Sequence, residues 1–232
     1  MSLVDGPHTA QSKPSLLPGA MRREDAFDLV YPAMIRSLSP RFWTPVDVAR
    51  RAAQLFRNAG VGTVLDVGAG VGKFALVAAT AVPEIHFVGV EQRDRLVELA
   101  RLAATKMRVP NASFLLGDAF DAPWTAFGGF YFFNPFAENL FDKSDHIDDQ
   151  VLLTRERFLH DVLCVENALR ACRIGTAVVT YHGMGAPIPA CFELRQAERA
   201  RSDWLRLWVK NQATDDGGFF LEMDDGIHRC SR

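Results

Sequence analysis

The feature that most constrains this chain is a repeated alternation of short apolar strands with amphipathic helices. Strands are expected at 63–67, 85–90, 112–116, 130–133 and 176–181, and helices between them at 71–82, 93–107 and 151–172. Apolar strands linked by helices indicate a parallel sheet with helices packed on both of its faces.

The end of the chain breaks this rhythm. Residues 182–189 are too few and too rich in Pro and Gly for a crossover helix, whereas 191–197 and 204–210 are strand-like and joined by polar residues. That pattern predicts an antiparallel hairpin on the edge of the sheet. We therefore expect an α/β fold: a doubly wound, mostly parallel sheet of seven strands, with helices on both faces and an antiparallel C-terminal edge hairpin.

One domain accounts for the chain. Its 232 residues, with 48% apolar side chains, suffice for a single core. Residues 1–20 contain several Pro and Gly and few bulky apolar groups, which predicts a flexible N-terminal arm. Residues 21–232 are expected to form the domain, with helices at 21–60, a ligand-binding core at 61–182, and the hairpin and tail at 183–232.

Charge and cysteine usage restrict location and partners. A net charge of −2 excludes a globally basic nucleic-acid clamp, although not a local basic face. The first twenty residues lack the basic start and apolar stretch of a signal peptide, and no apolar run reaches the roughly 18 residues of a membrane span. The four cysteines form no C-x-x-C pair, which is typical of thiols in a reducing compartment. These features favour a cytoplasmic location without a membrane partner.

The strongest motif is VLDVGAGVGK at 64–73, in which a strand delivers Asp66 to its carboxyl end and three glycines turn the chain into a helix. Ligands of open parallel sheets bind beyond this end of the strands. The third glycine stands at Gly72, one residue too early for the dinucleotide pattern G-x-G-x-x-G. Asp66 would repel a pyrophosphate and suits a cationic amine or sulfonium. An ordinary βα turn is the alternative.

Further carboxylates end the next two strands. Glu91 can accept hydrogen bonds from two ribose hydroxyls, and Asp118 can accept one from an exocyclic amine. Phe120 is placed to lie against a purine face. Each carboxylate alone also fits a solvated strand end or a helix cap. Three of them after three consecutive strands, beside a glycine turn, indicate a nucleoside site.

In these motifs the sequence resembles class I S-adenosylmethionine-dependent methyltransferases, over about residues 44–210. The segments that carry the resemblance are VLDVGAGVGK (64–73), GVE (89–91), GDAF (117–120) and FFNPF (132–136). The resemblance implies the core strand order 3-2-1-4-5 and S-adenosylmethionine as the cofactor. It also implies the cofactor contacts: Asp66, Gly68, Ala69, Gly70 and Gly72 at the methionine portion, Glu91 and Gln92 at the ribose, and Asp118, Ala119 and Phe120 at the adenine.

The segment Asn134-Pro135-Phe136 is the expected acceptor site. In family members that methylate nitrogen, a similar Asp/Asn-Pro motif offers oxygens to the target amine, and an aromatic neighbour stabilises the developing charge. Asn134 would also border the cofactor. The match is partial, and a strand ended by Pro is the alternative.

Thr44-Pro45 resembles the Thr-Pro start of a helix that closes over the cofactor in adenine-N6 methyltransferases. It would then contact the cofactor through Thr44. The alternative is a plain helix start, with Thr44 as the N-cap and Pro45 in the first turn.

Two other segments have several interpretations. The acidic stretch 137–150 fits a solvated loop, a lid or, less well, a metal site, and we expect no metal. His182, after the fifth strand, fits a base or a loop histidine without a role.

The function favoured by the sequence is methyl transfer from S-adenosylmethionine to a nitrogen, with protein lysine or a small amine preferred as acceptor and nucleic acid not favoured. A non-catalytic S-adenosylmethionine-binding protein and an O-methyltransferase are the alternatives. A nicotinamide-dependent reductase is disfavoured by the glycine spacing and by Asp66.

Overall fold

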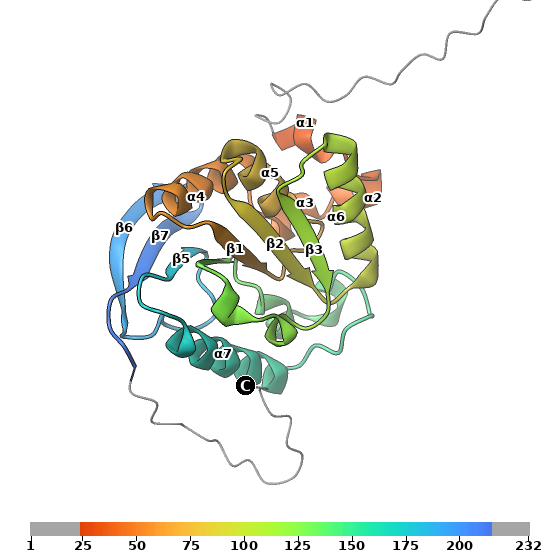
Figure 1. The fold of residues 1–232 in the computed structure, drawn as a ribbon. Coiled ribbons are helices and arrows are strands. Elements are labelled where there is room, and N and C mark those ends of the chain that lie inside the picture. Colours follow the sequence, from red (N-terminus) through yellow and green to blue (C-terminus); the bar gives the residue numbers. More distant parts are fainter. Residues whose placement is uncertain (1–23, 215–232) are drawn as a thin grey trace, which may run out of the picture.

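A computed structural model describes residues 24–214, and it confirms the predicted sheet (Figure 1). The strands are β1 (Thr63–Val67), β2 (His86–Glu91), β3 (Ala112–Leu116), β4 (Gly129–Phe132), β5 (Ala177–Tyr181), β6 (Phe192–Ala200) and β7 (Asp203–Lys210). The longer helices are α4 (Val46–Asn58), α5 (Lys73–Ala81), α6 (Asp94–Met107) and α7 (Arg155–Ala171). The predicted arm at 1–20 and the tail after residue 214 lie outside the described residues.

The sheet has the strand order β3-β2-β1-β4-β5-β7-β6. Strands β1 to β5 are parallel, whereas β7 is antiparallel to β5 and to the edge strand β6. As predicted, no helix forms between β5 and β6, so this chain enters the hairpin directly. Because the first five strands are parallel, their carboxyl ends meet at one edge of the sheet.

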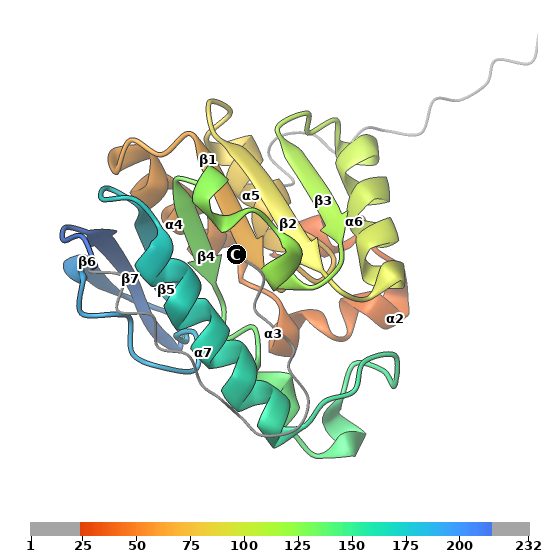
Figure 2. The ribbon, with the colours of Figure 1, turned by 60° about the horizontal axis from the view of Figure 1, so that its bottom comes forward.

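Each face of the sheet has its own apolar core, because successive strand residues point to opposite sides. Val64 packs into the core under α4, α5 and α6, whereas Leu65 and Val67 pack into the core under α7. Figure 2 shows α7 crossing one face of the sheet while α4 and α5 cover the other. Residues 24–214 include no helix that combines the length and the hydropathy needed to cross a membrane.

Three short helices precede α4: α1 (Glu24–Asp28), α2 (Ala33–Arg36) and α3 (Ser39–Phe42). Helices α1 and α3 are fixed to the core by Lys73, the first residue of α5, whose ammonium group is completely buried. It contacts the Glu24 carboxylate, lies 2.7 Å from Asp28 Oδ1 and donates a 2.7 Å hydrogen bond to Ser39 Oγ. The N-terminal helices therefore form part of the domain.

The start of α4 differs from the prediction. Pro45, not Thr44, occupies the N-cap position. The buried Thr44 Oγ1 is instead 2.9 Å from the Tyr131 hydroxyl of β4. The Val46 N–H, which has no acceptor within the helix, donates to Glu24 Oε2 at 3.0 Å. The prediction of Thr44 as the N-cap was wrong because a carboxylate from α1, distant in sequence, satisfies the end of this helix.

Candidate active site

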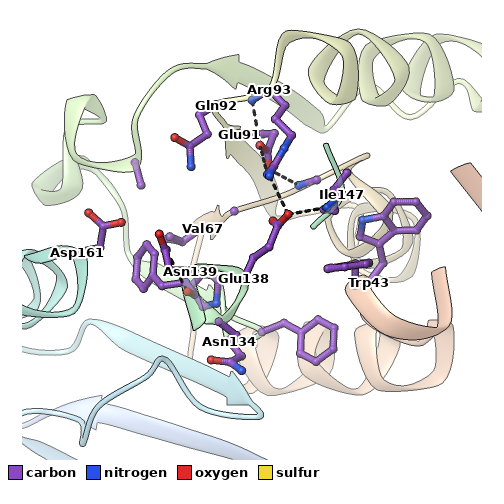
Figure 3. Close-up of a pocket in the computed structure, with 18 of the residues that line it drawn as sticks. Trp43, Val67, Glu91, Gln92, Arg93, Asn134, Glu138, Asn139, Ile147 and Asp161 are labelled. Atoms are coloured by element: carbon purple, nitrogen blue, oxygen red, sulfur yellow. Dashed lines mark hydrogen bonds and ion pairs between the residues drawn. The ribbon is translucent and has the colours of Figure 1, made fainter. Parts of the chain in front are cut away.

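A cavity of about 350 Å³ lies beyond the carboxyl ends of β1, β2 and β4 (Figure 3). Most of the predicted site residues line it: Gly68, Gly70, Glu91, Gln92, Asp118, Ala119, Phe120, Asn134, Pro135 and Phe136. Thr44, Asp66, Ala69 and Gly72 are not part of its lining. The size is within the range of small-molecule sites.

The glycine turn places two glycines at the cavity and one in the core. Gly70 has φ +54°, and a Cβ there would lie 2.7 Å from the indole nitrogen of Trp43, a cavity residue. Gly72 has φ +76°, and a Cβ there would lie 2.4 Å from the ring of Phe114. Gly72 therefore allows α5 to pack on the sheet, while Gly68 and Gly70 present backbone to the cavity.

Asp66, on β1, immediately precedes the cavity residues Val67 and Gly68. It is 4% exposed, and its Oδ2 has no hydrogen-bond partner within residues 24–214. Burial, and to a lesser degree repulsion from Glu91, raise the pKa of Asp66 to about 8. A buried carboxylate of this kind favours either protonation or a nearby cation.

Glu91 links the ends of β1 and β2. One of its oxygens accepts the Gly70 N–H and the other accepts the Arg93 N–H, both at 3.0 Å. Burial raises the pKa of Glu91, and these backbone hydrogen bonds and the Arg93 charge oppose the rise. Each carboxylate oxygen has two lone pairs, so both oxygens can still accept a hydroxyl from the cavity.

Arg93 fixes the acidic segment over the cavity. Its side chain is 5% exposed and lies 2.9 Å from both Glu138 and Asp148, and 3.8 Å from Glu91. Glu138 also accepts the Ile147 N–H at 2.7 Å, and Figure 3 shows Glu138 between Arg93 and Ile147. The segment 137–150 is therefore docked and contributes cavity residues, among them Glu138 and Ile147.

The described part of the chain has no group of His, Cys, Asp and Glu arranged to hold a metal.

The Asp118 carboxylate is already engaged. Its Oδ1 accepts the Phe120 N–H at 3.0 Å, and its Oδ2 lies 2.6 Å from the guanidinium of Arg157 on α7. Arg157 also contacts Asp161 at 3.2 Å. An adenine amine at Asp118 would therefore share this carboxylate with Arg157. The nearby ring of Phe120 is stacked with Phe136, with centroids 6.3 Å apart.

Asn134 follows β4 with φ +44°, a left-handed conformation that Asn tolerates better than most residues. Its N–H donates to Gly183 O at 2.9 Å, and its side-chain amide has no hydrogen-bond partner within residues 24–214. The next residue, Pro135, packs against the glycine turn, since a Cβ at Gly68 would lie 3.0 Å from Pro135 Cβ. The predicted acceptor segment and the glycine turn therefore abut.

The sequence motifs missed several cavity residues, namely Trp43, Arg93, Glu138, Arg157 and Asp161. Trp43 stands beside the Thr-Pro pair, and Glu138 lies in the acidic segment, so proximity to a motif was a usable signal for both. Nothing in the local pattern marks Arg93 or Arg157.

A parallel sheet with a glycine turn after β1 and carboxylates after β2 and β3 defines the class of Rossmann-like, nucleoside-binding enzymes that includes the S-adenosylmethionine-dependent methyltransferases. Residues 60–206, more than half of the chain, match the family model described as "Methyltransferase domain", and the chain belongs to that family. This membership confirms the predicted class and, with the observed sheet, its fold.

Two curated relatives match parts of the chain. A release factor glutamine methyltransferase from Vibrio cholerae is 39% identical over 59 residues, which are 25% of this chain and 21% of the relative. A tRNA (guanine-N(7)-)-methyltransferase from Prochlorococcus marinus is 32% identical over 81 residues, 35% of this chain and 37% of the relative. The chain therefore matches well under half the length of either protein.

A solved structure extends the likeness over more of the fold. The RNA methyltransferase from Salinibacter ruber, in complex with S-adenosyl-L-homocysteine, has a TM-score of 0.50 and 21% identity, and the match covers 75% of this chain and 97% of that one. At this identity the likeness concerns the fold alone. The tRNA named in the description of one curated relative leaves the prediction against nucleic acid as an acceptor without support.

Proposed function

We propose that this protein transfers the methyl group of S-adenosylmethionine to a nitrogen atom of its acceptor. In this proposal the cofactor lies across the ends of β1 to β3, with its amino-acid end near Asp66 and the Gly68–Gly70 backbone, its ribose at Glu91 and its adenine near Asp118 and Phe120. The cofactor supplies an activated methyl group, so the chain has mainly to align the acceptor and exclude water.

The side-chain amide of Asn134 is the observation that carries the choice of nitrogen. It borders the cavity and has no partner within residues 24–214, so its oxygen is free to accept an N–H. Because Pro135 packs on the glycine turn, an amine held by Asn134 would lie close to the cofactor's amino-acid end. The aromatic ring of Phe136 would stabilise the positive charge that develops on the nitrogen.

The names of the relatives are consistent with nitrogen chemistry on two kinds of molecule: a glutamine of a protein and guanine N7 of a tRNA. Protein side chains, small amines and nucleobases are therefore all candidate acceptors. The test is the formation of S-adenosylhomocysteine by the purified protein with three acceptor sets: lysine- and glutamine-bearing peptides, small amines, and tRNA. Binding of S-adenosylmethionine without turnover on any set would instead indicate a non-catalytic binder, and methylation of hydroxyl compounds alone an O-methyltransferase.

Replacing Asn134 with alanine should lower kcat about 100-fold and leave the Kd for S-adenosylhomocysteine unchanged, because the amide orients the acceptor and not the cofactor. Initial rates and calorimetry on the same preparation measure the two quantities. Asn211→Ala is the matched control, since Asn211 is exposed on the hairpin and hydrogen-bonds Glu193. A variant at position 134 as active as the control would remove Asn134 from the acceptor site.

A further inference from the structure

We propose that Ser202 and His182, with Asp203 behind them, accept the proton that the acceptor nitrogen loses. The inference rests on the proposed methyl transfer. It narrows the set of candidate acceptors to those whose nitrogen carries a proton. An amine or an amide meets that condition, and guanine N7 does not.

The three side chains are arranged in series. His182 Nε2 lies 3.0 Å from Ser202 Oγ, and His182 Nδ1 lies 3.3 Å from Asp203 Oδ2. The hydroxyl of Tyr181 lies 2.9 Å from the same Ser202 oxygen. A carboxylate facing Nδ1 favours the tautomer protonated there, which leaves the Nε2 lone pair to accept the Ser202 hydroxyl.

This series belongs to the wall of the cavity that also holds Asn134. Tyr181, His182 and Ser202 line the cavity. The bond from Asn134 N–H to Gly183 O joins the loop after β4 to the loop after β5. The ring of Phe133 packs on His182, with centroids 5.4 Å apart.

The backbone supports a functional interpretation. His182 has φ +59° and Asn134 has φ +44°, so the residues after two adjacent strands both adopt the left-handed conformation. Such conformations are costly for residues other than Gly and cluster at sites where a side chain must be aimed. Here both bring a polar side chain to the same cavity.

The charged surroundings of His182 come from several elements. Asp203, at the start of β7, is the acid that faces it. Tyr181 packs edge-on against the imidazole, and Phe133 contributes an apolar face. Arg201, a base in the turn between β6 and β7, has its guanidinium held by Asp47 at 2.7 Å and by Glu24 at 3.4 Å. Asp203 is therefore the charge positioned to stabilise an imidazolium.

The nitrogen lone pair forms the N–C bond as the C–S bond breaks and its electron pair stays on sulfur. The nitrogen then bears a positive charge and releases a proton to Ser202 Oγ, while the hydroxyl proton of Ser202 passes to His182 Nε2. The imidazolium is stabilised by Asp203 and returns its proton to water, to which it has access because the His182 side chain is 35% exposed.

His182→Gln tests whether His182 accepts the proton, because glutamine keeps a polar side chain but cannot take up a proton as an imidazole does. We expect kcat to fall about 100-fold and the acid limb of the pH–rate profile to disappear, with the Kd for S-adenosylhomocysteine unchanged. Ser202→Ala, which keeps the imidazole, should lower kcat about tenfold. His86→Gln is the control, because His86 Nε2 also hydrogen-bonds a serine hydroxyl, Ser113 Oγ at 2.9 Å, but stands at the start of β2, away from the cavity.

A second readout needs no turnover. In the ¹⁵N–¹H spectrum of histidine-labelled protein, the signal lost in His182→Gln should be that of a ring whose Nδ1 carries the proton facing Asp203, and Asp203→Asn should shift it. A wild-type activity that survives His182→Gln with its pH profile intact overturns this inference and leaves the proposed function standing. Absence of turnover by the wild-type protein on every acceptor set overturns both.

Discussion

Replacing Arg93 with methionine should lower the free energy of unfolding by about 3–5 kcal/mol, the range found when one partner of a buried ion pair is removed. Methionine keeps an apolar stem of similar length, so the loss isolates the charge. Glu138 and Glu91, with side chains 12% and 8% exposed, would remain buried without their cation. Denaturant titration measures the change in stability.

The same variant should release the segment 137–150 from its place over the cavity, because Arg93 forms ion pairs with two residues of that segment, Glu138 and Asp148. Hydrogen exchange at Ile147 N–H, which Glu138 accepts in the native protein, reports that release directly. Arg170→Met is the matched control: Arg170 pairs with Glu166 on the exposed face of α7, at 44% exposure, where an ion pair contributes about 0.5 kcal/mol. Equal losses in the two variants would show that the ion pairs of Arg93 contribute no more to stability than an exposed ion pair does.

The sheet was predictable because its signals are local. Runs such as 63–67 and 176–181 are apolar and β-branched, and the Pro- and Gly-rich stretch 182–189 is too short for a crossover helix. These patterns predicted the strands and the edge hairpin, whereas the strand order of the core followed from the family resemblance; the structure confirms both. Boundaries shifted by a residue or two where a turn intervened, as at α5, which begins at Lys73 because Gly72 has a positive φ.

The candidate site was predictable only in part. A glycine motif marks the turn, but its spacing does not tell a glycine that faces a ligand from one that faces a ring, and Gly72 packs on Phe114. The pairing of Arg93 with Glu138 and Asp148 joins positions 45 and 55 residues apart, and no local pattern encodes such a contact. The left-handed conformation of His182 likewise follows from the tertiary structure: histidine adopts it more often than most residues, but still uncommonly, so the sequence alone does not predict it.

Replacing Asp66 with asparagine should stabilise the cofactor-free protein at neutral pH. Burial first, and then Glu91, raise the pKa of Asp66 to about 8, whereas an aspartate in an unfolded chain titrates near about 3.9. Between these values the native protein holds a proton that the unfolded chain has released, so the stability of the wild type falls as the pH rises from about 4 to about 8. Asparagine does not titrate. Its advantage should be near zero at about pH 4 and reach about 2–5 kcal/mol by about pH 8, measured by denaturant titration across that window.

The same substitution should weaken the binding of S-adenosylmethionine about 10- to 100-fold at pH 7, because the ionised carboxylate, whose Oδ2 lacks a partner within residues 24–214, would face the cationic end of the ligand. Binding to the wild type at pH 7 should then release close to one proton, since the ligand's positive charge lowers the pKa of Asp66. Calorimetry in buffers of different ionisation enthalpy counts that proton. Asp47→Asn, at an exposed aspartate that pairs with Arg201, should change neither quantity. A proton count that is the same in Asp66→Asn as in the wild type would place the ligand's charge elsewhere, because only a titrating group at position 66 can supply the difference.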